Sequence, residues 1–382
     1  MRRAARLDGI EPFHVMDILA RARTLEAEGR SIVHMEIGEP DFPTANVILR
    51  AGVAAIERGE THYTPALGLP ALRAAIAASY PPAARPSAER VVVTPGASGA
   101  LQLACALLLD PGDEVLLADP GYPCYRHLVR LFEGRPLLIP VDAASAYQLT
   151  AEQVRSHWGP ATRAVLLASP SNPAGTLVGP AELKRIARAV EELGGTLIVD
   201  EIYHGLVYEG EVQSALGLSD RVFVVNSFSK YYGMTGWRIG WLVAPAETIR
   251  HLDRLAQTLF LAANTPGQHA ALAALGAEAR VELERRRVEF QRRRDYLLPA
   301  LRALGFGVPL VPSGAFYFYA DCSRFSPDSE RFTRDLLDRA GVAIAPGKDF
   351  GDYRADRHVR FSYANTLENL KEGVRRLETC LC

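Results

Sequence analysis

Residues 227–240 hold a lysine, two serines and an arginine at a spacing that suits one kind of chemistry. Lys230 follows Ser227 and Ser229 and precedes Arg238 by eight positions. An unprotonated lysine amine can form a Schiff base with a carbonyl, and serine hydroxyls with a guanidinium can hold a phosphate dianion. Pyridoxal 5′-phosphate (PLP) is the cofactor that needs both. The competing interpretation is a solvated loop, but the apolar, aromatic and glycine neighbours are unusual for a solvated face.

Further polar residues follow apolar runs elsewhere in the chain. Asp200 ends such a run, and its carboxylate could keep the PLP pyridine nitrogen protonated, so that the ring remains an electron sink. Asn172, in a Pro-Ser-Asn-Pro-Ala-Gly-Thr segment, and Tyr203 could both donate to the phenolic oxygen of PLP. Such donors would lower the pKa of the Schiff base. The alternatives are a helix N-cap for Asp200 and a plain Asn-Pro turn for Asn172.

Three other positions are candidates for binding anions or the cofactor ring. Ala97 and Ser98 follow an apolar run at 91–94 and open a helical pattern, and backbone N–H groups at a helix N-terminus bind phosphate. Tyr122 could stack on the pyridine ring or be a core aromatic. Arg360 lies in a predicted strand, where a buried arginine needs a partner. That partner is either the substrate α-carboxylate, held by a bidentate fork, or a structural salt bridge.

The middle of the chain alternates between apolar runs and helical patterns. Because the runs are almost continuously apolar, we expect strands buried on both faces of a mostly parallel sheet. Helical patterns at 97–109 and 180–193 predict an α/β domain with helices on both faces. Ligands of such sheets bind beyond the carboxyl ends of the strands, so the polar residues that follow them can converge. The predicted strands are 90–94, 114–118, 164–168, 196–200, 222–225 and 239–243.

The amino-acid composition of the chain changes near residue 266. Residues 266–304 are rich in Ala, Leu, Glu and Arg and predict one or two long helices. Two basic clusters, at 285–287 and 292–294, alternate with glutamates, which favours a solvated helix face over a nucleic-acid patch. The rest of the chain predicts a smaller α+β domain, on which the first 40 or so residues are expected to pack. Its predicted strands are 315–319 and 358–362, and its predicted helices are 329–340 and 367–379.

Composition narrows the class of protein. A chain of 382 residues is expected to form two domains, and 48% hydrophobic with 23% charged residues is ordinary for a globular protein. The net charge of −1 predicts neither nucleic acid nor membrane as a partner, and no apolar run could span a bilayer or serve as a signal core. Five scattered cysteines indicate reduced thiols and a cytoplasmic location. Cys380 and Cys382 lack further ligands nearby, so no metal site is expected.

Taken together, these residues resemble the PLP-dependent aminotransferases of fold type I, class I/II, the aspartate aminotransferase superfamily. The resemblance covers nearly the whole chain. The ordered set Asn172, Asp200, Tyr203 and Lys230 and the Lys230–Arg238 spacing are its most specific parts. The matching segments are 37–42, 63–65, 68–73, 170–176, 200–203, 227–238, 314–317 and 360–362.

The resemblance implies a fold, an assembly and a set of roles. It implies a large PLP-binding domain at 45–280, with a mostly parallel seven-stranded sheet between helices, and a discontinuous small α+β domain from 1–44 and 281–382. Lys230 would carry PLP as an internal aldimine and move the proton between Cα and C4′. Tyr63 would reach the cofactor of the neighbouring subunit, which requires a homodimer. The phosphate would be held by Arg238, Ser227, Ser229, Ala97 and Ser98, and the substrate α-carboxylate by Gly38, Asn172 and Arg360.

The implied activity is transfer of an amino group between an L-amino acid and a 2-oxo acid by a ping-pong mechanism. Relatives specialised for aspartate carry a Tyr-Trp pair after the proline at 120, whereas this chain has Gly121 and Tyr122. No distal cation dedicated to a second carboxylate is evident, although Arg126 or His127 are candidates. We therefore expect a broad or uncharged-substrate preference. A PLP-dependent C–S or related lyase and a non-enzymatic PLP sensor are the alternatives, and no DNA-binding domain precedes residue 30 to favour the sensor.

Overall fold

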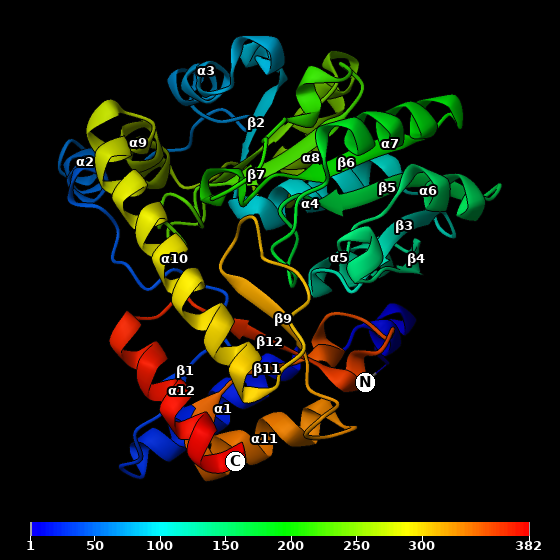
Figure 1. Cartoon of the computed structure of the whole chain (residues 1–382). Coiled ribbons are helices and arrows are strands. Elements are labelled where there is room, and N and C mark those ends of the chain that lie inside the picture. Colours follow the sequence, from blue (N-terminus) through cyan, green and yellow to red (C-terminus); the bar gives the residue numbers. More distant parts are fainter. Residues whose placement is uncertain (1, 382) are drawn as a thin grey trace.

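The computed structural model describes residues 2–381 and has a seven-stranded sheet at its centre (Figure 1). The strand order is β2-β8-β7-β6-β5-β3-β4. All neighbours run parallel except β8, which is antiparallel to both β2 and β7. The prediction of a mostly parallel α/β sheet is therefore confirmed. The strands are β2 (Val91–Thr94), β3 (Glu114–Asp119), β4 (Arg135–Pro140), β5 (Thr162–Ala168), β6 (Thr196–Asp200), β7 (Phe223–Ser227) and β8 (Gly240–Val243).

Both faces of this sheet are covered, which explains the apolar runs. Val92 and Leu117 belong to the core beneath α4, α5 and α8. Val93 and Leu116, which point the other way, belong to the core beneath α3, α6 and α7. Because successive side chains point to opposite faces, every position of a doubly covered strand must be apolar. The helices are α3 (Pro70–Ser79), α4 (Gly96–Leu108), α5 (Pro123–Leu131), α6 (Ala151–His157), α7 (Pro180–Glu192) and α8 (Ile249–Leu259).

Strand β4 is the one strand of the seven-stranded sheet that sequence patterning did not predict. It contains Pro136 and Pro140, and proline lowers strand propensity because it cannot donate to the ladder. The structure places β4 at the edge of the sheet, where it pairs only with β3. An edge strand has one side without a partner, and this position tolerates the prolines.

The remaining strands form two small sheets at the opposite end of the molecule (Figure 1). One is the antiparallel sheet β11-β12-β9, and the other pairs β1 with β10 in parallel, Val33 opposite Val342. Helix α1 buries Ile18 and Leu25 against Leu337 of α11, so the N-terminal segment packs on the C-terminal one. Division into domains at residues 45 and 281 stays a prediction. The elements are α1 (His14–Ala27), β1 (Val33–His34), β9 (Tyr317–Asp321), α11 (Ser329–Ala340), β10 (Val342–Ala343), β11 (Ala345–Pro346), β12 (His358–Ser362) and α12 (Leu367–Leu381).

Helix α10 (Ala277–Leu304) runs along both parts of the molecule, from α9 (Thr265–Ala274) beside α2 (Asn46–Glu57) to α12 (Figure 1). The prediction that its arginine clusters are a solvated face is wrong for three of them. Arg286 donates to the Pro43 carbonyl at 2.7 Å, and Arg293 pairs with Asp41 at 2.7 Å. Arg294 pairs with Glu209 at 2.6 Å. These arginines are buried because their side of the helix faces the 41–43 and 207–209 loops.

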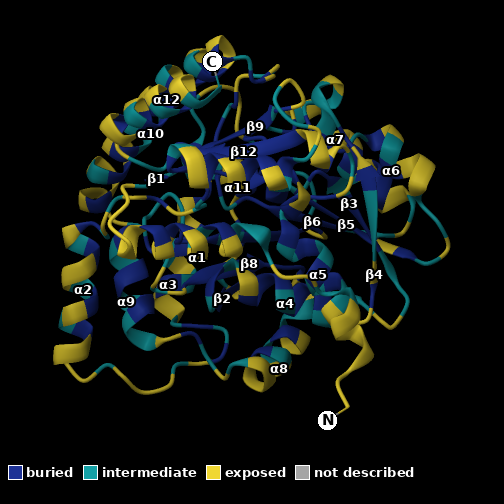
Figure 2. Ribbon diagram, turned by 90° about the horizontal axis from the view of Figure 1, so that it is seen from below, coloured by how far each residue is buried: buried dark blue, intermediate teal, exposed yellow. Residues whose placement is uncertain are grey.

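Burial follows this layered plan. Figure 2 shows most strands as buried, the edge strand β4 as only partly buried, and the outer faces of the surrounding helices as exposed. Within residues 2–381, no helix combines the length and apolar character that crossing a membrane demands.

Candidate active site

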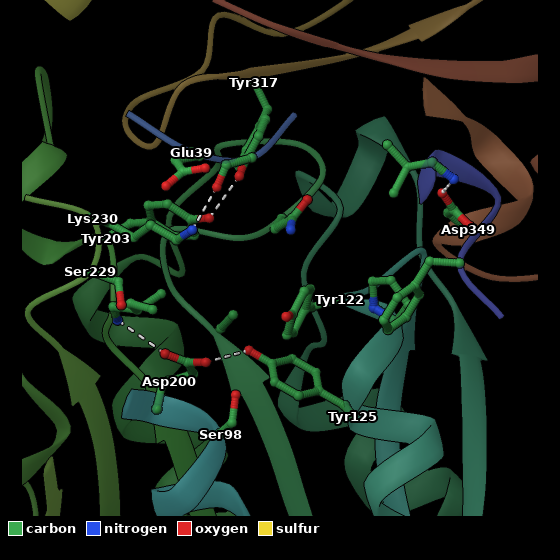
Figure 3. Close-up of a pocket in the computed structure, with 18 of the residues that line it drawn as sticks. Glu39, Ser98, Tyr122, Tyr125, Asp200, Tyr203, Ser229, Lys230, Tyr317 and Asp349 are labelled. Atoms are coloured by element: carbon green, nitrogen blue, oxygen red, sulfur yellow. Dashed lines mark hydrogen bonds between the residues drawn. The ribbon is translucent and has the colours of Figure 1, made fainter. Parts of the chain in front are cut away.

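A cavity of about 370 Å³ lies beyond the carboxyl ends of β3, β5, β6 and β7 (Figure 3). Side chains from the small antiparallel sheet and its loops close its other side. The cavity brings together most of the residues that the sequence predicted, although they lie far apart along the chain. Those residues are Gly38, Ala97, Ser98, Tyr122, Asn172, Asp200, Tyr203, Ser229, Lys230, Arg238 and Arg360.

Lys230 lies just after β7, and its side chain points into this cavity. Its Nζ donates a hydrogen bond of 2.5 Å to the carbonyl oxygen of Gly38. Burial lowers the pKa of the Lys230 amine to about 8; Glu39 acts in the opposite direction, and Arg360 lowers the pKa further. A lowered pKa makes the neutral, nucleophilic and basic amine accessible near neutral pH.

The same shift predicts how stability depends on pH. The unfolded chain has a lysine pKa near 10.5 and the folded one near 8, so the unfolded state binds more protons between these values. Stability of the cofactor-free protein should therefore rise with pH across this window. Lys230→Met, which removes the group, should stabilise the protein below pH 8 by at most about 3 kcal/mol. Urea unfolding at pH 7, 9 and 10.5 measures this gain in unfolding free energy, with Lys184→Met on the exposed face of α7 as control. A gain that grows with pH would contradict the prediction.

Asp200 ends β6 and lies deep in the cavity. Its carboxylate accepts hydrogen bonds from the Tyr125 hydroxyl at 2.7 Å and the Ile202 N–H at 3.0 Å (Figure 3). Burial raises the pKa of Asp200 to about 6, and the two hydrogen bonds limit that rise. Asp200 is therefore mostly ionised at pH 7, as an ion-pair partner for a protonated ring nitrogen must be.

Arg360 is a buried guanidinium with unused hydrogen-bonding capacity. It donates to Asn172 Oδ1 at 3.1 Å and to the Glu36 carbonyl. It also stacks over the rings of Tyr317 and Phe350, at 4.3 and 4.8 Å from their centroids. Its Nε has no hydrogen-bond partner, and among residues 2–381 no carboxylate forms a salt bridge with it. An incoming carboxylate would supply that partner.

Ala97 and Ser98 lie in the first turn of α4, and Gly96, which opens that helix, lies against Arg238. A Cβ at Gly96, which has a φ of +71°, would overlap the Arg238 guanidinium. A Cβ at Gly240 would come within 2.5 Å of the Gly96 carbonyl carbon and 2.7 Å of the Ala97 nitrogen. The two glycines therefore let β8, Arg238 and the α4 N-terminus approach one another, which makes a cradle for an anion.

This close approach predicts that Gly240→Ala will damage the cradle. A methyl group there meets backbone rather than a flexible side chain, so the variant should lose at least about 2 kcal/mol of unfolding free energy. Gly179→Ala is the matched control, because Gly179 has a φ of −62° and no atom within 4 Å of an added Cβ. Urea unfolding compares the two variants. Equal losses of unfolding free energy would mean that the contact at β8 relaxes without strain.

Two predicted residues lie outside the cavity. The Ser227 hydroxyl lies 2.9 Å from the Ser229 hydroxyl and 3.1 Å from the Ile239 carbonyl. It therefore orients Ser229 from the side of that residue that faces away from the cavity. Tyr63 is 82% exposed, and this chain alone does not bring it to the cavity. Its predicted contact is with a neighbouring subunit, and that stays a prediction. The Cys380–Cys382 pair includes Cys382, which lies outside the described residues.

The sequence analysis missed the apolar wall of the cavity and one hydrogen-bonding phenol. Phe13, Val15, Ile37 and Phe350 line the cavity from loops and a helix start, where no strand-end pattern points to them. Tyr125 had a signal, since it follows Tyr122 by three positions at the start of α5 and therefore shares its face. The two rings pack edge to face at 5.3 Å.

Neither of the two candidates for a distal cation lies in the cavity. Of the described lysines and arginines, only Lys230, Arg238 and Arg360 line it, so Arg126 does not. His127 lies outside the lining as well, and burial lowers its pKa. The wall around the cavity thus offers a substrate side chain apolar contacts and no second dedicated cation.

The cavity fits PLP at each functional end of that cofactor. Arg238, Ser229 and the α4 N-terminus would hold its phosphate, Asp200 its pyridine nitrogen, and Lys230 its carbonyl carbon. When bound, PLP supplies a carbonyl for an amino group and a ring that withdraws electrons from Cα. This sheet order with this residue set defines a PLP-dependent enzyme of fold type I.

Comparison with known proteins agrees with this class. The family model described as "Aminotransferase class I and II" matches residues 30–377. A valine–pyruvate aminotransferase of Mycobacterium tuberculosis is 39% identical over 99% of this chain and 98% of its own length. A (5-formylfuran-3-yl)methyl phosphate transaminase of Methanocaldococcus jannaschii is 37% identical over 98% of both chains.

Solved structures give the same answer. A crystal structure of an aminotransferase from Mycobacterium tuberculosis matches with a TM-score of 0.96 and 38% identity, over 100% of this chain and 99% of that one. The aspartate aminotransferase of Thermus thermophilus, solved with maleate, matches with a TM-score of 0.94 and 35% identity, over 99% and 100%. The chain belongs to the class I and II aminotransferases. It is a PLP-dependent transaminase, and the lyase alternative is not favoured.

Proposed function

We propose that this transaminase takes its amino group from L-amino acids with uncharged side chains and passes it to a 2-oxo acid. The observation that carries this proposal is the Arg360 guanidinium, buried beside Asn172 with a free Nε and surrounded by a wall that holds no second dedicated cation. One carboxylate can be bound bidentately there, and a second finds no counterpart among the lining residues that this chain itself supplies. Burying an unpaired carboxylate among apolar residues is unfavourable.

In this proposal, the residues of the cavity divide into three groups by function. Lys230 takes the proton from the substrate Cα, because its lowered pKa leaves part of the amine neutral at pH 7. Arg360, Asn172 and Gly38 bind the α-carboxylate and so orient Cα toward Lys230. The cofactor-binding residues are Ala97, Ser98, Tyr122, Asn172, Asp200, Tyr203, Ser229 and Arg238, with Ser227 acting through Ser229 and Tyr63 from the neighbouring subunit.

Tyr203 has a neighbour that supports its role. Its hydroxyl lies 2.9 Å from that of Tyr317 (Figure 3). Burial raises the pKa of both phenols, so both stay protonated and can donate hydrogen bonds. A chain of two phenols lets Tyr203 donate to an acceptor in the cavity while it accepts from Tyr317.

We also propose that the active form is a homodimer. Supporting this, Leu49, Val53 and Ile56 form an exposed apolar stripe along α2, and Tyr63 is exposed a short distance beyond it. Such a stripe on a chain with net charge −1 fits a second copy of itself. Mixing inactive Lys230→Ala and Tyr63→Ala proteins should restore activity, because one of the two sites in a mixed dimer is intact. Sedimentation of a monomer together with no restored activity would reject the dimer.

A cytoplasmic location and domain boundaries at 45 and 281 remain parts of this proposal. The location is supported by Cys105, Cys124, Cys322 and Cys380, which are free thiols. The boundaries are supported by the position of α10, which begins near residue 281 and leads from the large sheet to the small ones.

A half-reaction tests the proposed function. PLP-loaded protein is mixed with single amino acids and no 2-oxo acid acceptor, and the released 2-oxo acid is counted. The proposal expects a burst close to one 2-oxo acid per site with leucine, valine or phenylalanine, and a much weaker one with aspartate. Continuous release of pyruvate and ammonia from cysteine-type substrates would indicate the lyase reaction instead. No product with any amino acid would contradict the proposal.

A further inference from the structure

The start of α1 is built in an unusual way. The position before a helix normally holds Ser, Thr, Asp or Asn, whose side chain accepts the first free N–H groups. Here that position is Phe13, which makes no side-chain capping hydrogen bond. Phe13 lines the active-site cavity instead, and so does Val15, two residues further on. The chain has therefore placed an apolar residue where a capping residue is expected.

Asp349 supplies the missing cap from a distant part of the chain. Its Oδ1 accepts from the His14 N–H at 2.7 Å, and its Oδ2 accepts from the Val15 N–H at 2.8 Å. Asp349 is 1% exposed, so both oxygens are withdrawn from water. A carboxylate at a helix N-terminus also interacts favourably with the helix dipole. Figure 3 shows Asp349 at the edge of the cavity, across from Lys230.

The segment before Phe13 and the loop after Asp349 are each anchored as well. Arg130 of α5 donates to the Gly9 carbonyl at 2.6 Å. The Asp119 carboxylate, at the end of β3, accepts from the N–H groups of Asp352 and Tyr353 at 3.0 Å each. Asp349 therefore sits on a fixed loop and holds a segment whose other end is also fixed. Phe13 also packs edge to face on the His127 ring, and Val15 packs against the main core, so the Asp349 carboxylate adds the polar part of this anchoring.

We propose that Asp349 is a positioning residue for substrate specificity. By capping α1, it holds Phe13 and Val15 in place as the apolar wall against which the donor side chain packs. The wall favours donors with bulky apolar side chains, such as leucine or phenylalanine, over alanine and over dicarboxylic amino acids. This inference rests on the proposed function, because it assumes that the cavity takes an amino-acid donor.

Asp349→Asn tests the inference with little change in size. The asparagine amide has only one acceptor oxygen, and its NH₂ group would face one of the two backbone N–H groups that Asp349 now accepts from. One of the two capping hydrogen bonds is therefore lost. The ratio of kcat/KM for leucine to kcat/KM for alanine should fall about tenfold, because a displaced wall loses contact mainly with the larger side chain. Hydrogen–deuterium exchange at residues 13–17 should become faster in the same variant. Asp328→Asn is the matched control, since Asp328 accepts from two backbone N–H groups at the start of α11, away from the cavity.

A second pair of variants distinguishes loss of the helix cap from loss of the apolar wall. It also keeps the inference testable if Asp349→Asn does not fold. Phe13→Ser removes the wall but adds a local cap, so it should lower the leucine-to-alanine ratio without faster exchange. Adding Phe13→Ser to Asp349→Asn should restore slow exchange and leave the ratio low. An unchanged ratio in Phe13→Ser, or faster exchange in Asp349→Asn with an unchanged ratio, would overturn the inference. A wild-type preference for aspartate would reject the proposed donor class and the inference that rests on it, while transamination itself would stand. No 2-oxo acid from any donor would reject the proposed function as a whole, whereas the outcomes for the Phe13 and Asp349 variants bear on the inference alone.

Discussion

Replacing Lys230 with alanine should lower kcat by at least about 10⁴-fold, since the variant loses its general base and the amine that joins the cofactor carbonyl. The cavity has no second amine to take over, because the two other cations that line it are arginines, which stay protonated. Asp200 is not expected to replace it either, because its carboxylate is assigned to the pyridine nitrogen of PLP.

The loss can be assigned to the amine itself. Added methylamine should restore part of the activity of Lys230→Ala in proportion to its concentration, because the vacated space can admit a small base. Lys184→Ala, on the exposed face of α7, should keep full activity. Single-turnover formation of 2-oxo acid measures both. If Lys230→Ala keeps more than about one per cent of kcat, general-base catalysis by Lys230 is wrong.

Arg360→Gln should raise KM for amino donors about 100-fold, because removing one partner of a buried charged pair costs several kcal/mol. The effect should be on KM more than on kcat, since the guanidinium binds a carboxylate that does not react. Arg360→Lys should recover only part of the loss, because an ammonium is a point charge and cannot form the bidentate fork.

An amine that lacks the carboxylate distinguishes recognition from misfolding. Wild-type protein and Arg360→Gln should process a simple primary amine at similar, low rates, because neither uses the guanidinium for it. Arg357→Gln, at an exposed residue immediately before β12, is the matched control and should leave KM unchanged. If Arg360→Gln impairs the amine as strongly as the amino acid, carboxylate binding is not its role.

Several of the residues that the sequence identified stand at or just beyond the ends of buried parallel strands. Asp200 ends β6, and Lys230 lies three residues beyond β7. Apolar runs reveal such strands, and the carboxyl ends of parallel strands lie at one edge, so the convergence follows from local patterns. The antiparallel strand β8 adds Arg238 to the same edge, because the chain must reverse between β7 and β8.

The residues that the sequence did not identify depend on packing between distant segments. Asp349 accepts from the His14 N–H across 335 positions, and neither segment carries a local pattern that reveals the other. The buried arginines of α10 were misread for a related reason. Glutamates three or four positions away predict a solvated helix, but the loops that cover Arg286 and Arg293 come from elsewhere in the chain.

The order of the strands also determines when this enzyme can become active during synthesis. Val91 of β2 pairs with Val243 of β8, and Val33 of β1 pairs with Val342 of β10. Contacts between residues so far apart in sequence form late, because the intervening chain must be made and its loop closed first. Phe13 and the start of α1 leave the ribosome among the first residues, whereas Asp349, which caps that helix, follows near the end of synthesis. The nascent chain therefore carries Lys230 in an open site for its last hundred or so residues, and we expect the substrate-binding side of the cavity to be complete only after Asp349 and Arg360 have emerged.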